Sequence, residues 1–385
     1  MHSSFILPSA LLQSFSLPTH VVAKMTMFSL ALLFALSACS SLFYALKVHL
    51  LFLKFWFRSP ASFSCFCFLI FTREMKVAQD GSGDYTTVQE AIDAVPLNNT
   101  SRTVIRVAPG VYKQPVFVPK TKDLITLVGL SPEHTVLTWN NTFEKIEHHL
   151  DSETIGTGTF GCGSVMIEGE DFIAENITFE NSSPEGSHQA VAIRVSGDRA
   201  AFYNCRFLGW QDTMYLHRGK QYLKDCYIEG SVDFIFGNST ALFEHCHVHC
   251  KANGFVTAQS RKTAEESTGY VFLRCVITGN GGTSYAYLGR PWGPFGRVAY
   301  AYTYMDQCIN AEGWHNWDKA ENEGTACFCQ YRCFGPGSDL SKRVAWAKEL
   351  KDEEAQQFIV HGFIDPDPEK PWLAQKLTLR MPHSA

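Results

Sequence analysis

The sequence lacks a strong excess of charge of either sign. Its 385 residues include 33 Lys and Arg against 38 Asp and Glu, which gives a formal net charge of −5. Nucleic acids and strongly acidic partners attract proteins through a marked positive balance. The composition therefore offers no electrostatic basis for binding either of them.

The sequence also lacks the motifs of two common catalytic classes. No G-x-S-x-G sequence is present, so the Ser-His-Asp route to ester hydrolysis lacks its usual sign. Cys327, Cys329 and Cys333 cluster, but no second Cys/His pair stands near them at zinc spacing. Three histidines alternate along one expected strand without a carboxylate or Cys partner at convincing spacing: His245, His247 and His249. We expect no metal site and no cofactor.

No Pro/Ser-rich linker divides residues 76–385, which predicts one domain over that range. Residues 1–75 differ from it in composition. Met27 to Leu46 is apolar and uncharged after Lys24, as in a signal peptide or a signal anchor. Secretion is the interpretation we favour. Alternatively, translation starting near Met75 would make 1–75 a non-native extension and the protein cytoplasmic.

What the sequence does contain is a repeat. The segments FYNCRF, LKDCYI, FEHCHV and FLRCVI place cysteines at 205, 226, 246 and 275, at intervals of 21, 20 and 29 residues. A strand-like unit that recurs every 20 to 30 residues indicates a stack of coils, most simply a parallel β-helix. Cysteines at one position of successive coils favour a buried stack of thiols over disulfides. Cys226–Cys246 is the alternative pair for a bridge.

The two ends of the repeat region predict helices. Residues 76–96 read as a strand, a Gly-rich turn and a short helix that Thr86 or Thr87 would cap. Such a helix would cover the open end of the stack. The segment from Ser341 to Phe358 also has a helical pattern, and we expect it to lie across the side of the stack. Asn-rich turns between strands suit left-handed corners between the sheets.

Asp212 and Asp233 stand in apolar, aromatic contexts, in WQDTMY and SVDFIFG, where Asp is uncommon. They are 21 residues apart, the length of one coil. Because one coil rises by about 4.8 Å, this spacing puts the two carboxyl groups on neighbouring coils. Two close carboxyl groups cannot both ionise easily, so one can attack as a carboxylate while the other donates a proton.

With these residues named, 76–385 resembles the plant pectinesterase (pectin methylesterase) family. The motifs are GVYKQ at 110–114, HQAVAIR at 188–194, GWQDTMY at 209–215, SVDFIFGN at 231–238 and LGRPW at 288–292. The family usually has Glu at Gln114 and Leu at Met214, neither of which is a catalytic position. Nothing in 1–75 resembles the helical inhibitor-like pro-region of longer members. The resemblance implies an all-β fold, a right-handed parallel β-helix.

The resemblance also implies site residues and their roles. Asp233 matches the nucleophile and Asp212 the general acid and base, and Arg290 matches the arginine beside the nucleophile. The side-chain amides of Gln189 and Gln211 match the oxyanion hole of the family. Trp292 matches an aromatic residue that stacks on the substrate, and Thr159 matches a further substrate contact. The implied reaction is hydrolysis of the methyl esters of galacturonate in pectin, with release of methanol.

We expect a monomer that binds pectin and, as a further partner, a proteinaceous pectinesterase inhibitor. Two alternatives stay open. One is another polyuronide-acting β-helix enzyme, a lyase or a glycosidase, which would shorten the chain instead of releasing methanol. The other is a non-catalytic pectin-binding β-helix, against which the intact set of Asp, Gln and Arg residues argues.

Overall fold

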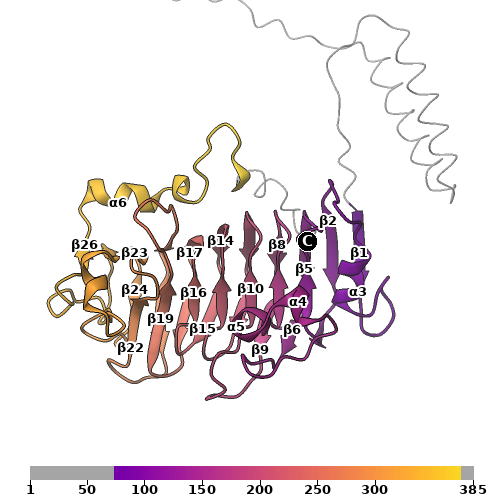
Figure 1. Ribbon diagram of the computed structural model, residues 1–385, viewed down its shortest axis with the longest axis horizontal. Helices are drawn as coiled ribbons and strands as arrows, with labels where there is room; N and C mark the ends of the chain where they lie inside the picture. Colours follow the sequence, from indigo (N-terminus) through magenta and orange to yellow (C-terminus); the bar gives the residue numbers. More distant parts are fainter. Residues whose placement is uncertain (1–72, 374–385) are drawn as a thin grey trace, which may run out of the picture. The chain divides into compact units, whose positions relative to one another are not determined.

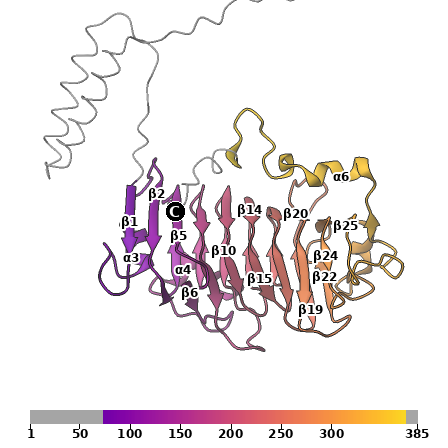
Figure 2. The same ribbon diagram turned by 180° about the vertical axis from the view of Figure 1, so that it is seen from behind.

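The computed structural model describes residues 73–373, and the apolar stretch predicted at 27–46 lies outside them. The described chain forms three parallel sheets with few helices (Figures 1 and 2). Successive strands pass from one sheet to the next, so each full coil adds one strand to each sheet. This arrangement is the right-handed parallel β-helix that the repeat and the resemblance predict.

We name the sheets A, B and C. Sheet A has eleven strands: β1 (Arg73–Val77), β2 (Thr103–Val107), β5 (Ile125–Gly129), β8 (Ile173–Glu175), β11 (Ala200–Tyr203), β14 (Lys220–Lys224), β17 (Thr240–Glu244), β20 (Gly269–Leu273), β23 (Arg297–Ala301), β25 (Cys327–Tyr331) and β26 (Lys348–Glu349). Sheet B has eight: β3 (Gly110–Lys113), β6 (Thr135–Trp139), β9 (Thr178–Asn181), β12 (Arg206–Leu208), β15 (Tyr227–Gly230), β18 (His247–Cys250), β21 (Val276–Gly279) and β24 (Tyr304–Met305). Sheet C has seven: β4 (Val116–Val118), β7 (Val165–Ile167), β10 (Ile193–Val195), β13 (Met214–Leu216), β16 (Ile235–Gly237), β19 (Gly254–Gln259) and β22 (Ala286–Pro291).

From β8 onward, the corner that follows each strand of sheet A depends on one left-handed residue in each coil. Seven such residues have φ between 48° and 57°: Asn176, Asn204, Asp225, His245, Arg274, Tyr302 and Arg332. Asparagine tolerates this conformation best among residues with a side chain. The expected Asn therefore appears in the first two of these coils, while the later coils use other residues.

The four repeat cysteines follow directly after such corner residues and form the predicted stack. Cys205, Cys226, Cys246 and Cys275 are buried free thiols. Each of the last three donates its S–H to a backbone carbonyl of the preceding coil, as Cys226 does to Phe202 at 3.6 Å. The alternative of a Cys226–Cys246 disulfide is wrong. The thiols serve as small core side chains that also satisfy backbone acceptors.

The predicted helix covers the first coil. This helix is α3 (Val88–Asp93), and Thr87 caps it. The Thr87 hydroxyl accepts a hydrogen bond from the N–H of Glu90, and the Glu90 side chain accepts one from the N–H of Thr87. Val88, Ala91 and Ile92 join the main core. Figure 1 shows α3 at the same end of the stack as β1, which starts at Arg73, three residues before the expected strand.

The C-terminal segment is helical over a shorter range than predicted. Lys348–Glu349 pairs with β25 as a strand, and only Asp352–Ile359 forms α6. The expectation of a helix from Ser341 is therefore wrong for its first part. Ala355 and Phe358 of α6 pack on the outer face of sheet A, as expected of a segment that lies across the stack. The remaining helices are short: α4 (Ser152–Ile155), α5 (Gly158–Gly161), η1 (Ala320–Gly324) and η2 (His361–Phe363).

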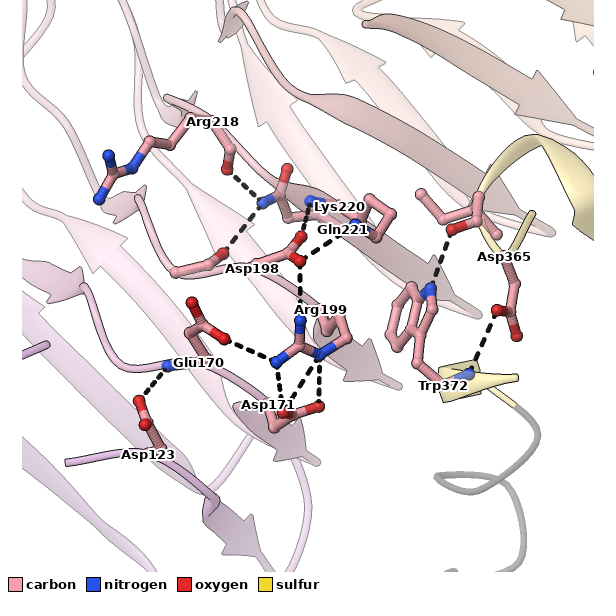
Figure 3. Close-up of polar contacts among 12 residues, drawn as sticks. Asp123, Glu170, Asp171, Asp198, Arg199, Arg218, Lys220, Gln221, Asp365 and Trp372 are labelled. Carbon is pink, nitrogen blue, oxygen red and sulfur yellow. Dashed lines mark hydrogen bonds and ion pairs between the residues drawn. The ribbon is translucent and has the colours of Figure 1, made fainter. Parts of the chain in front are cut away.

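A network of charges stabilises the corner between sheets C and A. Figure 3 shows Arg199 among the carboxylates of Glu170, Asp171 and Asp198, with Lys220 on the far side of Asp198. These side chains come from three successive coils. The hydrogen bonds to Asp171 and the surrounding negative charge raise the pKa of Arg199. Because one arginine serves several carboxylates, the network ties the coils together more firmly than isolated surface pairs would.

Candidate active site

Asp212 and Asp233 occupy equivalent places on neighbouring coils. Each lies two residues before a strand of sheet C, and the register pairs Met214 of β13 with Ile235 of β16. Both have left-handed backbones, with φ of 63° and 51°. The N–H of Asp212 donates to the carbonyl of Val232 at 3.0 Å, which joins the two turns directly. The pairing that the 21-residue spacing predicts is confirmed.

Arg290 binds the second of these carboxyl groups. It lies on β22, and its Nε and Nη2 donate to the two oxygens of Asp233 at 2.8 and 2.6 Å. The guanidinium lies between the rings of Phe255 and Trp317, 3.9 and 3.7 Å from their centroids. Stacking on two rings and a bidentate bond leave Arg290 little freedom, so it orients the Asp233 carboxylate.

The two carboxyl groups are buried to the same degree but differ in their partners. Asp212 is 7% exposed and Asp233 is 6% exposed. Burial raises the pKa of Asp212, and the charge of Asp233 raises it further. Burial also raises the pKa of Asp233, but hydrogen bonds and charge from Arg290 act in the opposite direction. Arg290 also lowers the pKa of Asp212, but less than burial and the charge of Asp233 raise it, so the surroundings favour the proton more at Asp212 than at Asp233.

The predicted glutamines lie beside this pair. The backbones of Gln189 and Gln211 are bridged to each other, and the N–H of Ala190 donates to the Gln211 carbonyl at 3.2 Å. Both glutamines are half-buried. Gln211 directly precedes Asp212, so its backbone lies in the same turn. The position suits donors to an oxygen bound at Asp212 and Asp233.

Aromatic side chains line the sheet next to the carboxyl pair. The outer face of sheet C carries one row of residues in register: Arg194, Tyr215, Phe236, Ala258 and Arg290. Tyr215 and Phe236 stack at 4.3 Å, and Trp292 lies 6.0 Å from Phe236 with 44% of its surface exposed. An exposed tryptophan above an aromatic row is a surface on which a sugar ring can lie.

The sequence analysis assigned no role to Tyr215, Phe236, Phe255 or Trp317. A signal existed for the first two, because each stands three residues after one of the aspartates. This third position comes after the left-handed aspartate and faces outward on sheet C. Phe255 and Trp317 had no comparable signal, since their importance comes from Arg290 lying between them.

Thr159 lies on the short helix α5 and is half-buried. Its neighbour Phe160 contacts the aromatic row, with its ring 6.3 Å from that of Tyr215 and 3.8 Å from the Arg194 guanidinium. Within residues 73–373, none of the hydrogen bonds of the carboxyl pair involves the Thr159 hydroxyl. The structure thus groups the other predicted residues more closely than it groups Thr159 with them.

The histidines that alternate on β18 make ordinary hydrogen bonds. His247 and His249 both contact the hydroxyl of Thr278, at 2.7 and 2.8 Å. Over the described range 73–373, no three His, Cys, Asp or Glu side chains gather as a metal site. The same range contains no helix long and apolar enough to cross a membrane.

The family model described as Pectinesterase matches residues 74–367. The chain belongs to the pectinesterase family. It is 72% identical over 314 residues to Pectinesterase 31 of Arabidopsis thaliana, an alignment that covers 82% of this chain and 99% of that protein.

Solved structures of pectin methylesterases resemble this pectinesterase closely. The enzyme from carrot has a TM-score of 0.71 and 35% identity, covering 79% of this chain and 95% of the carrot chain. A pectin methylesterase in complex with a hexasaccharide has a TM-score of 0.66 and 25% identity, covering 78% and 99% of the two chains.

This pectinesterase is a carboxylic ester hydrolase. It removes the methyl esters of galacturonate units in pectin, releases methanol and so modifies the plant cell wall. The alternatives of a chain-cutting polyuronide enzyme and of a non-catalytic pectin-binding β-helix do not account for these matches. Its substrate partner is pectin.

Proposed function

We propose that Asp233 is the nucleophile of this esterase. The observation that carries the proposal is the bidentate hydrogen bond from Arg290, which favours the ionised carboxylate and fixes its direction. One oxygen of Asp233 attacks the carbonyl carbon of the methyl ester. The carbon–methoxy bond breaks in the following step and leaves an acyl-enzyme anhydride on Asp233.

Asp212 acts first as the acid and then as the base. Its proton passes to the departing methoxy oxygen, which leaves as methanol. The Asp212 carboxylate then takes a proton from a water molecule whose oxygen attacks the anhydride. That step frees the galacturonic acid unit, which gives its proton to solvent. It also restores ionised Asp233 and leaves the other proton of the water on Asp212. The burial that raises the pKa of Asp212 suits this cycle, because the group must hold a proton between turnovers.

Gln189 and Gln211 stabilise the tetrahedral oxyanion through their side-chain amides. An amide N–H donates without competing as an acid, and donors fixed before the reaction cost no reorganisation. The polysaccharide lies along the outer face of sheet C. Trp292 stacks on a sugar ring there, next to Phe236. Thr159 makes a further substrate contact from α5.

Further assignments rest on the sequence and on the family. We propose that residues 76–385 are the catalytic domain and that the apolar segment in 1–75 directs secretion to the cell wall. We also propose that the enzyme works as a monomer and that a proteinaceous pectinesterase inhibitor binds it. N-terminal sequencing of the mature protein tests the secretion route, since a start near Met75 would contradict it.

The Asp233→Asn variant tests the assignment of the nucleophile. It keeps the shape of the side chain but removes its negative charge, so methanol release from methyl-esterified pectin should fall by about 10⁴-fold or more. Thermal melting checks that the fold persists. Asp306→Asn, at a half-buried residue directly after β24, is the matched control and should keep normal activity. A fully active Asp233→Asn enzyme would refute the proposal.

A further inference from the structure

Two of the three cysteines that cluster near the end of the stack lie on one face of β25. Cys327 and Cys329 are two residues apart in this strand, so both side chains point to the same face of sheet A. Cys329 is buried in the outer apolar cluster that includes Phe358 of α6. Cys327 packs at the edge of this cluster and is partly exposed. Figure 2 shows β25 and α6 at the same end of the stack.

The two sulfur atoms face each other. Their Sγ atoms are 3.5 Å apart and share a hydrogen bond. Residues two apart in a strand have Cα atoms about 6.6 Å apart, near the upper end of the range of about 4.4–6.8 Å that disulfides span. The neighbouring strand β26 pairs with Cys329 and Gln330 and leaves the edge beside Cys327 open. A reagent can therefore approach Cys327, whose sulfur is within reach of a second thiol.

Positive charges lie on both sides of the pair. Arg297 of β23 is the register partner of Cys327, and Lys348 of β26 is that of Cys329. The hydrogen bond from Cys329 lowers the pKa of Cys327. Burial opposes this effect, and the charges of Lys348, Arg297 and Arg261 add to it. Cys327 is therefore the member of the pair that becomes a thiolate, the form in which cysteine attacks.

Cys329 keeps the proton of the pair. The hydrogen bond to Cys327 raises the pKa of Cys329, burial raises it further, and the Glu354 carboxylate on α6 acts in the same direction. The charge of Lys348 opposes them. Once the sulfur of Cys327 enters a disulfide, the negative charge that held this proton is gone. Cys329 can then ionise and attack in its turn.

Cys333, the third member of the cluster, lacks this arrangement although it too is partly exposed. Its thiol donates to the Tyr300 carbonyl at 3.3 Å. Burial raises the pKa of Cys333 to about 11. It therefore serves as an internal control, with similar exposure and a thiol that stays protonated.

We propose that Cys327 and Cys329 form an oxidation site, at which a small disulfide such as glutathione disulfide converts the two thiols to a disulfide within β25. The Cys327 sulfur attacks one sulfur of the reagent, the S–S bond of the reagent breaks, and one thiolate leaves. Cys329 then gives its proton to solvent, its sulfur attacks that of Cys327, and the second thiolate leaves. The protein pair is oxidised, the reagent is reduced, and each leaving thiolate takes up a proton from solvent.

The bridge should be easy to reduce. The strand holds the two Cα atoms near the upper limit of disulfide geometry, and a disulfide at such a limit is more reducible than a relaxed one. The site is therefore expected to cycle between its two states with the supply of small thiols and disulfides.

The experiment uses the full-length protein, purified with a reductant and then freed from it. At neutral pH, iodoacetamide should alkylate Cys327 at least about tenfold faster than Cys333, as followed by mass spectrometry of the peptides. Glutathione disulfide should give a bridge between Cys327 and Cys329 in the folded protein. Excess reduced glutathione should reverse it.

Variants separate the attacking thiol from the resolving one. Cys329→Ala removes the second thiol and its hydrogen bond, so the reaction should stop at a mixed disulfide on Cys327. The midpoint of the pH profile for alkylation of Cys327 should also move to higher pH in this variant. Cys327→Ser should form no bridge. Cys333→Ser is the matched control and should form the bridge as the unchanged protein does.

Four results would overturn the proposal. They are alkylation of Cys327 no faster than that of Cys333, a mixed disulfide that persists in the unchanged protein, a bridge that includes Cys333, or a reaction that occurs only after unfolding in urea. Alkylation of the unchanged protein decides the question even if a variant folds poorly. Because no arm measures methanol release, these results are independent of the roles proposed for Asp212 and Asp233.

Discussion

Arg290 holds both oxygens of Asp233, although 57 residues separate the two in the sequence. The arginine reaches the aspartate from β22 and is itself held flat between Phe255 and Trp317. A carboxylate fixed in this way has one orientation. The parallel coils make the contact possible, because they bring residues far apart in the chain onto one face of sheet C.

Arg290→Lys should lower kcat for methanol release by about 10²–10³-fold. A lysine is a point charge that cannot form the bidentate bond or stack between two rings, so Asp233 loses its orientation. The pKa of Asp233 should also rise, which moves the acidic limb of the pH–rate profile to higher pH. Kinetics from about pH 4 to 8 measure both effects. Arg274→Lys, at an exposed corner, is the control and should keep normal kcat. A kcat of Arg290→Lys within threefold of normal would contradict the role given to Arg290.

Trp292→Ala should raise KM for pectin by about tenfold and change kcat little. The exposed indole contributes binding surface for the sugar rings and touches no reacting atom in our account. Initial rates over a range of pectin concentrations separate the two constants. Phe334→Ala removes another exposed aromatic ring, from outside sheet C, and should leave both constants unchanged. An equal loss of kcat in Trp292→Ala would instead place the indole at the reacting ester.

Cys226→Ala should lower the free energy of unfolding by about 1–2 kcal/mol, because it leaves a small cavity in the thiol stack and removes the S–H hydrogen bond to the Phe202 carbonyl. A reducing agent should leave the denaturation midpoint of the unchanged protein unaltered, since the stacked cysteines are free thiols. Chemical denaturation with and without the reductant measures both. A loss of stability on reduction would show that a disulfide contributes.

The sequence predicted the coil architecture because the repeat is a local pattern that burial enforces. Four successive coils place a buried cysteine directly after the corner residue, and these cysteines mark the register of the repeat. The 21-residue spacing then placed Asp212 beside Asp233 without further information. The proposal for their chemistry needed the resemblance as well, since a spacing does not say which carboxyl group attacks.

Contacts made by irregular segments could not be predicted in the same way. Trp317 lies outside the regular strands, and nothing in the repeat connects it to Arg290. The segment after Ser341 has a helical pattern, yet Lys348 and Glu349 pair with the free edge of sheet A. An unpaired edge offers backbone hydrogen bonds that outweigh a weak local preference.

The account requires one protonated and one ionised carboxyl group, which defines the pH dependence. The rate should fall at high pH as Asp212 ionises and at low pH as Asp233 takes up a proton. Since burial raises both pKa values, the acidic limb should lie above the ordinary value of 3.8. The alkaline limb should disappear in Asp212→Asn, whose remaining activity lacks the titrating acid.

The most direct test is a ¹³C NMR titration of the aspartate carboxyl carbons, with Asp212→Asn and Asp233→Asn used to assign the two signals. At the pH of maximal activity the account predicts that Asp212 is still protonated and that Asp233 is ionised. An Asp212 carboxyl group that is ionised at this pH, and that titrates like an aspartate in a short peptide, would contradict the account.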